Sequence, residues 1–322
     1  MASAALRTAV LLACLTGLSA AMPVDQATGG AVGDLVGAPR TQVVGRDETL
    51  LEIARRHDLG FVELRAANPG VDPWAPLPGL ELALPTAHLL PEAPRRGIVI
   101  NLAEQRLYHF RAAGAVVTHP IGIGRQGWAS PLGETRIVGK RENPVWVPPD
   151  SLRAERPELP AAVPPGPDNP LGHYALDLGW EGYAIHGTNR PYGVGRRVSH
   201  GCIRLYPEDI EALFQDVAPG TPVNVVDQPV KIGRSEGELY LEVHPTQAQA
   251  DEIEARGRFT PVPVAQLQAR IVRAAGADAP RLDWALIGRV ARERRGIPVR
   301  VTRPAAPHDV PSGAVSGYLR SD

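Results

Sequence analysis

Cysteine is almost absent from this sequence of 322 residues, which contains only Cys14 and Cys202. A basic residue, a short apolar run and three small residues open the chain, and this order predicts a cleaved secretory signal peptide over residues 1–21. The mature chain then carries one thiol and no internal disulfide, in an oxidising compartment that we expect to be the periplasm. Cys202 is therefore either an inert buried residue or a working nucleophile.

Charge of one sign is also lacking, since 34 Lys and Arg residues nearly balance 35 Asp and Glu residues. No basic field is available to attract nucleic acid or anionic lipid, which excludes nucleic acid as a partner. The apolar run near the start of the chain is too short to span a bilayer, so we expect no transmembrane anchor. A partner must be recognised by local sites.

Proline and glycine are plentiful instead, with 33 residues of each, and they predict many turns and short strands rather than long helices. The length of the chain suits two or three domains. Residues 22–39 are rich in Gly and Ala without hydrophobic periodicity and predict a flexible leader. Residues 304–322 predict a disordered tail.

Residues 40–86 predict a small unit of the order strand, helix, helix, strand. The elements expected are a strand at 41–45, helices at 48–58 and 61–68, and a strand at 80–85. With Val44–Leu50 at its start and Ala67–Pro73 before its last strand, the segment resembles a LysM module. That resemblance implies a βααβ domain that binds N-acetylglucosamine-containing glycans such as peptidoglycan. A small spacer that binds no glycan is the alternative.

Residues 97–227 predict a mainly β domain, with short strands expected at 98–102, 106–110, 115–118, 135–140 and 183–185. A proline-rich stretch within 147–170 cannot join a strand ladder and predicts a surface loop that borders a cleft. Residues 228–303 predict a C-terminal α/β extension without evident chemistry. Its expected elements are strand structure at 231–244 and helices at 246–256, 264–274 and 282–294.

The reactive side chains gather in the block from Ser199 to Leu205. If this block is extended, side chains alternate, so that His200, Cys202 and Arg204 share one face while the aliphatic residues between them face the core. A proline and two acidic residues then predict the start of a helix at residue 207.

A cysteine needs help to react, because an unperturbed thiol is only about 3% ionised at pH 7. His186 lies 16 residues before Cys202 and ends a predicted strand. A neighbouring backbone carbonyl can then hold one ring nitrogen and leave the other free to accept a proton. His200 and Arg204 supply a positive field, and the N–H groups of Gly201 and Cys202 are candidates for an oxyanion hole.

The pair His186-Gly187 and the block Ser199-His200-Gly201-Cys202-Ile203-Arg204 together resemble the YkuD-type L,D-transpeptidase catalytic domain. The resemblance extends to residues 97–102 and 130–133, and the LysM-like segment together with residues 240–244 resembles the ErfK/YbiS branch. It implies a YkuD-like β-sandwich with short helices and no cofactor. It also implies that Cys202 is the catalytic nucleophile and His186 the proton acceptor, oriented by the carbonyl of Gly187. Supporting roles are implied for Gly187, Ser199, His200, Gly201 and Arg204.

The resemblance further implies the reaction. The enzyme attacks the L,D peptide bond after meso-diaminopimelate in a stem tetrapeptide, releases D-alanine and forms a thioester on Cys202, a residue that carbapenem-type β-lactams are also expected to acylate. Another diaminopimelate as acceptor gives a 3-3 cross-link, and the C-terminal lysine of a Braun-type lipoprotein attaches that protein to the wall. Water as acceptor would make the enzyme a carboxypeptidase. A glycan-binding wall protein with an inactive catalytic block is a further alternative.

A zinc site made by His173, His186, His200 and Cys202 is the metal alternative. The two-residue spacing of His200 and Cys202 and the lack of a carboxylate in the block argue against it, so we expect no metal there. Four further histidines, His57, His88, His119 and His308, are expected to be solvated. The pair Arg196-Arg197 is expected either to contact a substrate carboxylate or to be solvated as well.

Overall fold

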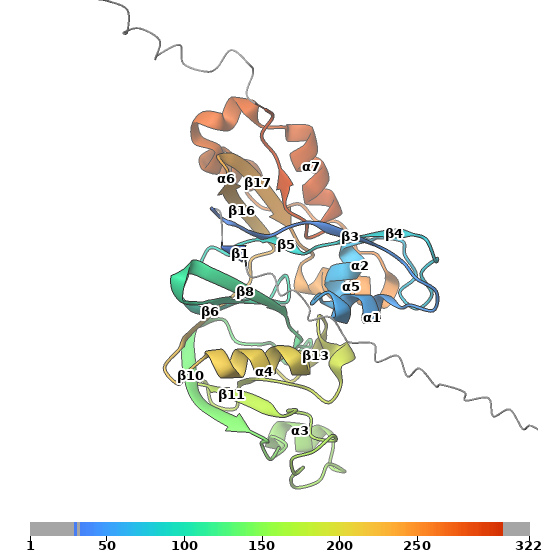
Figure 1. Ribbon diagram of the computed structural model, residues 1–322, viewed down its shortest axis with the longest axis vertical. Coiled ribbons are helices and arrows are strands. Elements are labelled where there is room, and N and C mark those ends of the chain that lie inside the picture. Colours follow the sequence, from blue (N-terminus) through green and yellow to red (C-terminus); the bar gives the residue numbers. More distant parts are fainter. Residues whose placement is uncertain (1–28, 31–32, 305–322) are drawn as a thin grey trace, which may run out of the picture.

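The computed structural model describes residues 29–30 and 33–304. The predicted signal peptide at 1–21, His308 and nearly all of the predicted tail lie outside the described residues. Three parts follow one another along the chain (Figure 1): an N-terminal unit (residues 33–89), a central domain (residues 97–226) and a C-terminal extension (residues 228–303). Within the described ranges, no helix has the length and apolar character that crossing a membrane requires.

The central domain is organised by one long mixed sheet, which has nine strands among the described residues, in the order β1-β8-β7-β6-β15-β10-β11-β12-β14. The strands are β1 (Gly29–Gly30), β6 (Gly97–Asn101), β7 (Arg106–Phe110), β8 (Ala115–Pro120), β10 (Gly133–Glu142), β11 (Tyr174–Leu178), β12 (Ala184–His186), β14 (Ile203–Arg204) and β15 (Pro222–Val226). The five strands predicted between residues 98 and 185 are all confirmed. Most neighbours are antiparallel, but β15 runs parallel to β6 and β14 runs parallel to β12.

The sheet curls at β10, because the first part of this strand pairs with β15 and the second part pairs with β11, with a bulge between Ile137 and Gly139. The two arms of the sheet enclose a single apolar core, to which Ile98 and Leu107 contribute from one arm and Leu176 from the other. The β-sandwich prediction is therefore corrected in one respect. The two layers are arms of one continuous curled sheet rather than separate sheets.

Two helices and a small parallel sheet complete the central domain. The parallel pair is β9 (Ile123–Gly124) with β13 (Arg197–Ser199). Helix α4 (Pro207–Asp216) begins at the predicted proline and has Glu208 and Asp209 in its first turn, which confirms the predicted helix start. The proline-rich segment predicted as a loop also contains a short helix, α3 (Asp150–Glu155).

The N-terminal unit has the predicted order of elements. Its strands β3 (Arg40–Val43) and β4 (Glu81–Leu84) pair antiparallel, and helices α1 (Leu50–Arg56) and α2 (Phe61–Ala67) lie between them in the chain. A capping box between Thr49 and Glu52 starts α1. Apolar residues of both helices and of β4, with Val44 directly after β3, form a core of their own around Leu50 and Leu64.

The flexible leader predicted at 22–39 is wrong for its described part. Strand β2 (Leu35–Gly37) pairs with β5 (Ala87–Leu89), and the Asp34 carboxylate accepts a hydrogen bond from the N–H of Arg234 at 2.7 Å. A side chain at Gly33 would stand 2.3 Å from the Arg234 carbonyl oxygen, so glycine permits the close approach of two backbones here. In this segment Gly33 is needed for close backbone packing against Arg234 rather than for flexibility.

The C-terminal extension is a three-stranded sheet with helices. Its elements are β16 (Val230–Ser235), β17 (Glu238–Val243), β18 (Val299–Arg300), α5 (Gln247–Arg256), α6 (Leu267–Ala275) and α7 (Trp284–Glu293). Helices α6 and α7 share an apolar core with the sheet, whereas α5 packs on α2 of the N-terminal unit through Ala250 and Ile253. The strand region and the three helices predicted for this part are confirmed.

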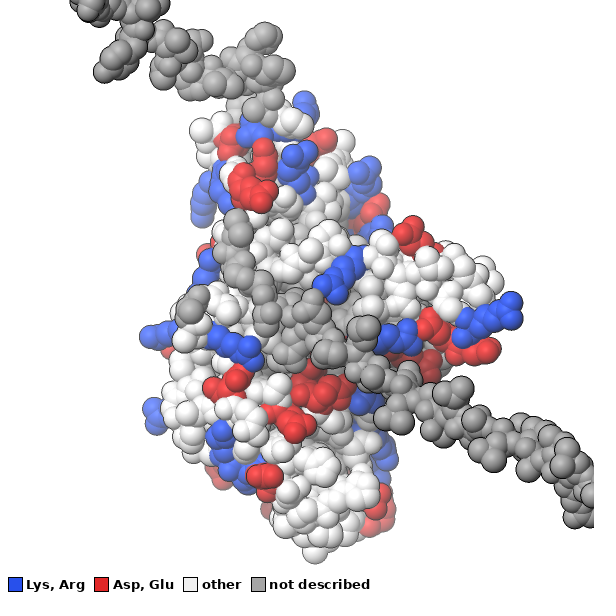
Figure 2. Space-filling model, in the orientation of Figure 1, with Lys and Arg blue, Asp and Glu red and all other residues white. Residues whose placement is uncertain are grey.

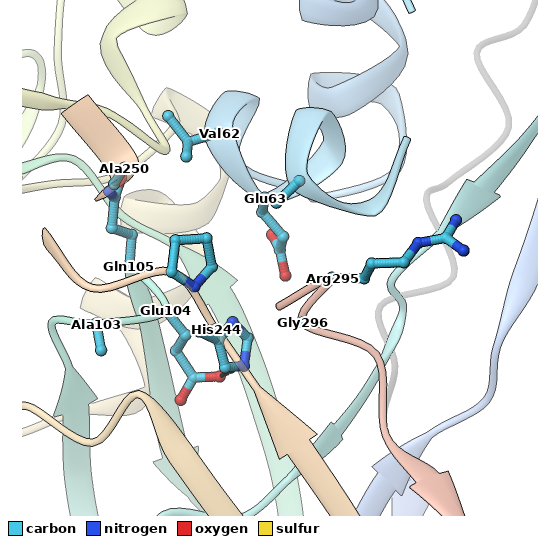
Figure 3. Close-up of a pocket in the computed structure, with 11 residues that line it drawn as sticks. Val62, Glu63, Ala103, Glu104, Gln105, His244, Ala250, Arg295 and Gly296 are labelled. Carbon is cyan, nitrogen blue, oxygen red and sulfur yellow. Dashed lines mark ion pairs between the residues drawn. The ribbon is translucent and has the colours of Figure 1, made fainter. Parts of the chain in front are cut away.

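Buried charges join the three parts. Lys231 of the extension lies 2.6 Å from Glu104 of the central domain and 2.9 Å from Glu242, and all three side chains are buried. Figure 3 shows the neighbouring cavity, of about 20 Å³, where Glu63 of α2 approaches the segment with Glu104 and Gln105 and the residue His244. A cavity of this size has room for one water molecule.

Two histidines expected in solvent are buried at these junctions. His88 is 3% exposed and His119 is 1% exposed, while His57 is half-buried beside Gln42. His88 lies 3.9 Å from Glu63 of α2, and His119 lies 3.9 Å from Asp58 of the N-terminal unit. The sequence pattern of one strand does not reveal such neighbours. On the face drawn in Figure 2, charges of both signs are interspersed, as the balanced composition predicts.

Candidate active site

Cys202 lies in a tight turn between β13 and β14 rather than within one extended strand as predicted. Gly201 has φ of +105°, and a side chain there would stand 2.7 Å from Cε1 of Tyr183. Glycine is therefore required by both conformation and space. The predicted alternation of burial nevertheless holds, because His200, Cys202 and Arg204 are half-buried and the residues between them are buried.

Two buried serine hydroxyls fix the turn. Ser199 Oγ donates to the carbonyl of Cys202 at 2.6 Å and accepts from the N–H of Gly201 at 3.1 Å. Ser130 Oγ donates to the carbonyl of Gly201 at 2.8 Å and accepts from the N–H of Gly124. The Gly201 N–H, which was expected to help form an oxyanion hole, is thus directed at Ser199. Ser130 begins the segment 130–133 that shares the family resemblance, but it was not selected as a site residue, because nothing in the sequence links its hydroxyl to the Cys202 turn.

The Cys202 thiol is protonated in the resting site. Burial raises its pKa, and the nearby N–H of Ala184 and the charge of Arg204 oppose that shift only in part. Its Sγ lies 3.7 Å from the carbonyl oxygen of Gly182, to which the S–H donates. Attack on a carbonyl then needs a base that removes the thiol proton.

His186 is placed beside Cys202 by the parallel pairing of β12 and β14. Ile185 pairs with Ile203 and His186 with Arg204, so His186 lies level with the residue that follows Cys202 by two positions, at the end of the turn. The Nδ1 atom of His186 lies 2.6 Å from the carbonyl oxygen of Gly187. Donation to that carbonyl places the ring proton on Nδ1 and leaves Nε2 as the acceptor.

The imidazole of His186 is neutral over the physiological range. Its side chain is 3% exposed, and burial, followed by the charge of Arg204, lowers its pKa to about 3. The site therefore holds a neutral thiol and a neutral imidazole rather than a thiolate–imidazolium pair. Such a pair transfers its proton during attack on the substrate.

Among the described residues, no acidic side chain acts on the charge of Arg204, and its buried Nε has no hydrogen-bond partner. Burial lowers its pKa, while Cys202 acts in the opposite direction. A nearly buried cation beside the thiol favours any negative charge that develops there or that a substrate brings.

His200 belongs to a cluster at the edge of the turn. Its Nε2 lies 3.1 Å from Arg125 and 3.4 Å from Glu155, and its ring meets Trp128 edge-on at 4.9 Å. Glu155 ends the short helix α3, so this helix, which precedes the proline-rich stretch, borders the site. The other three members of the cluster were not predicted, because they lie 47 to 77 residues from Cys202 in sequence and match no motif.

The remaining predicted site residues lie elsewhere. His173 is bonded to Asn143 at 3.0 Å, and among the described residues no cluster of metal-ligating groups includes Cys202. Arg196 and Arg197 pair with Glu254 and Asp251 of α5, so they hold the extension against the central domain and are neither free for a substrate nor merely solvated.

Comparison with known proteins gives a consistent result. The family model of the L,D-transpeptidase catalytic domain matches residues 95–225. The probable L,D-transpeptidase YcfS of Escherichia coli K12 is 42% identical over 280 residues, which are 84% of this chain and 85% of that protein. ErfK/SrfK of Salmonella typhimurium, also named a probable L,D-transpeptidase, is 40% identical over 83% of this chain and 88% of its own length. YbiS of Escherichia coli K12 is 38% identical over 80% of this chain and 84% of its own.

Proposed function

Since the chain belongs to the L,D-transpeptidase family, we propose that Cys202 is its nucleophile and that His186 is the base that accepts the thiol proton. The observation that supports this proposal is the pairing of β12 with β14, which brings a carbonyl-bound imidazole to the strand that directly follows the Cys202 turn. The protein is an L,D-transpeptidase enzyme.

The donor substrate proposed is a peptidoglycan stem tetrapeptide. Cys202 attacks the carbonyl carbon of the L,D bond after meso-diaminopimelate while Nε2 of His186 takes the thiol proton. The same proton then passes to the amine of D-alanine as the carbon–nitrogen bond breaks, which leaves a thioester on Cys202 and a neutral imidazole. The atoms and charges of this step balance without a cofactor or a metal ion.

Arg204 has the position to stabilise the charge of this reaction. Its buried, unpartnered Nε lies beside Cys202, so it is a donor for the developing oxyanion or for the carboxylate of the departing D-alanine. Gly187 holds His186 through its carbonyl, and Ser199 and Gly201 shape the turn. His200 limits the cleft together with Glu155.

The acceptor that resolves the thioester decides the biological product. A second diaminopimelate amine gives a 3-3 cross-link, a lipoprotein lysine gives an anchored lipoprotein, and water gives a carboxypeptidase. The half-buried thiol and the partly exposed side chains of His200 and Glu155 leave access for an amine acceptor.

The N-terminal unit is proposed to be a LysM module that binds the glycan of the wall, in a protein exported to the periplasm. Supporting this, the segment between α2 and β4 exposes two large apolar side chains, Trp74 at 63% and Leu77 at 74%. Exposed aromatic faces are suited to stacking on sugar rings. Pull-down with insoluble peptidoglycan, with and without Trp74→Ala, measures this binding separately from catalysis.

Catalysis is tested by incubating the protein with a disaccharide tetrapeptide, with and without a second tetrapeptide or a lysine-ended peptide as acceptor. Mass spectrometry separates a cross-linked dimer, a peptide conjugate and a tripeptide formed by hydrolysis. Cys202→Ala abolishes all three products if the proposal is right. Full activity of that variant would exclude Cys202 as the nucleophile.

A further inference from the structure

Three ligand-bearing side chains meet where the N-terminal unit touches the central domain. Asp58 follows α1, His119 lies on β8, and Asp209 lies in the first turn of α4. One ligand atom from each lies within 4.8 Å of the others. His119 and Asp209 are only 1% and 4% exposed. None of these residues takes part in the reaction described above.

Each member of this cluster has a buried atom that lacks a hydrogen-bond partner among the described residues, namely Oδ1 of Asp58, Nδ1 of His119 and Oδ2 of Asp209. His119 Nδ1 lies 3.2 Å from Oδ1 of Asp209 and 3.9 Å from Oδ2 of Asp58, yet neither approach has hydrogen-bond geometry. Buried polar atoms are nearly always paired. Three ligand-bearing side chains that gather within 4.8 Å, each with an unpaired buried atom, indicate a ligand that they share.

The nearby cations of the protein do not neutralise the two carboxylates. Arg106 donates to both carboxylate oxygens of Glu63, and it reaches only the backbone carbonyl of Asp58. Arg55 is held by Glu208 through two hydrogen bonds. Among the described residues, Asp58 and Asp209 therefore have no cationic partner except a protonated His119.

A second buried cluster in the same molecule shows the contrast. His88, Glu104 and Glu242 are likewise gathered within 4.8 Å, but the ammonium of Lys231 lies between the two carboxylates at 2.6 and 2.9 Å. A lysine supplies the positive charge there. The cluster around Asp58 also contains two carboxylates and one imidazole, but no lysine lies between its carboxylates.

We propose that Asp58, His119 and Asp209 form a binding site for a divalent transition-metal ion, for which Zn²⁺ is the best fit. One imidazole nitrogen with two carboxylates suits zinc, whereas Ca²⁺ and Mg²⁺ prefer six or more oxygen ligands. Bonds of about 2.0–2.1 Å at a tetrahedral angle separate ligand atoms by about 3.4 Å. The observed separations of 3.2 and 3.9 Å need only small shifts of the side chains.

The proposed ion would be structural. Its ligands come from both the N-terminal unit and the central domain, so binding fastens one to the other. Next to Asp58, the backbone of Gly60 packs against Gly195, and the N–H of Val62 donates to the Gly195 carbonyl at 3.1 Å. Gly195 belongs to the loop between His186 and Cys202. The metal would thus help to hold the loop that leads to the catalytic turn.

The test uses full-length protein with Cys202→Ser, so that the thiol cannot bind metal itself. After treatment with a chelator and its removal, Zn²⁺ is titrated, and bound metal is measured by equilibrium dialysis with elemental analysis. One zinc per chain is expected, together with a rise in the unfolding temperature. Asp209→Asn and Asp58→Asn should each weaken binding by at least about tenfold, the scale on which changes around metal ligands act. His88→Gln, in the lysine-filled cluster, is the matched control and should bind zinc normally.

Circular dichroism establishes that each variant is folded, and the visible spectrum of the Co²⁺ form reports the ligand geometry even where a variant is less stable. Failure of the folded parent protein to bind Zn²⁺ would overturn the proposal and assign the cluster to two carboxyl groups that share a proton. Unchanged zinc binding in both aspartate variants would overturn it as well. Neither outcome affects the assignment of Cys202, because every measurement is made without the thiol.

Discussion

His186 is expected to make the protein less stable in acid by an amount that the structure allows to be calculated. Its pKa falls from an ordinary value of 6.5 to about 3 on folding, because the ring is buried. Between these two pKa values the unfolded chain binds a proton that the folded chain excludes. The resulting loss of stability is absent above about pH 7 and grows as the pH falls toward 3. From pH 7.5 to pH 5, this difference lowers the free energy of unfolding by about 2 kcal/mol.

The assay is urea unfolding of the parent protein and of His186→Gln at these two pH values, both in the Cys202→Ser background. Other buried histidines titrate equally in the two proteins, so the difference between their pH dependences isolates His186. The parent should lose about 2 kcal/mol more than the glutamine variant. Equal losses would show that the imidazole is solvated or already charged. A smaller loss in the parent would show an imidazolium stabilised by the site, and the neutral-base mechanism would be refuted.

Three other predictions concern the site and its support. The rate at which iodoacetamide alkylates Cys202, measured by intact-protein mass, should keep rising with pH through pH 9, because burial raises the thiol pKa. A rate that is already constant near neutral pH would instead reveal a thiolate. Gly201→Ala should lower stability by about 1–3 kcal/mol and abolish tetrapeptide turnover, whereas Gly220→Ala, at a similar φ in open space, should keep full turnover. Arg106→Met should lower the free energy of unfolding in urea by about 3–5 kcal/mol, because it leaves the carboxylate of Glu63 buried without its partner. Adding Glu63→Gln should recover much of this loss. No recovery would argue against the ion pair as the cause.

Much of the fold could be predicted from the sequence, because the elements are short and strongly patterned. The order of strand, helix, helix, strand in the N-terminal unit and the helix start at Pro207 both depend on local signals of capping and periodicity. The curled sheet could not be predicted in full, because pairing between β10 and its two partners is a long-range choice. The leader failed for the same reason, since Gly33 is fixed by contact with Arg234, which lies 201 residues later.

The candidate site was predicted where reactive residues are close in sequence and missed where they are not. Cys202, His186 and Arg204 stand out because their residue types and spacing match a chemical need. Their geometric relation, however, depends on the parallel register of β12 and β14. The Gly201 N–H was expected to face a substrate, but the hydroxyl of Ser199 accepts its hydrogen bond, and no spacing rule reveals that competition.

The burial of His88 and His119 shows a further limit of sequence reasoning. On a single strand, a polar residue in an alternating pattern predicts a solvated side chain. Here, other parts of the chain cover those faces, and the histidines meet carboxylates from distant segments. Such junctions are invisible to any argument that treats the three parts separately.

The ion pair between Arg106 and Glu63 also bears on how this protein can be recombined. An N-terminal unit with its own core and a common order of elements looks suitable for transfer to another enzyme. Its underside, however, carries Glu63, whose only counter-charge at hydrogen-bonding distance among the described residues belongs to β7 of the central domain. A chimera that exchanged this unit for one without an acidic residue at that position would leave Arg106 as a buried charge without its carboxylate partner. A graft that keeps this ion pair must therefore carry the unit together with Arg106 of β7.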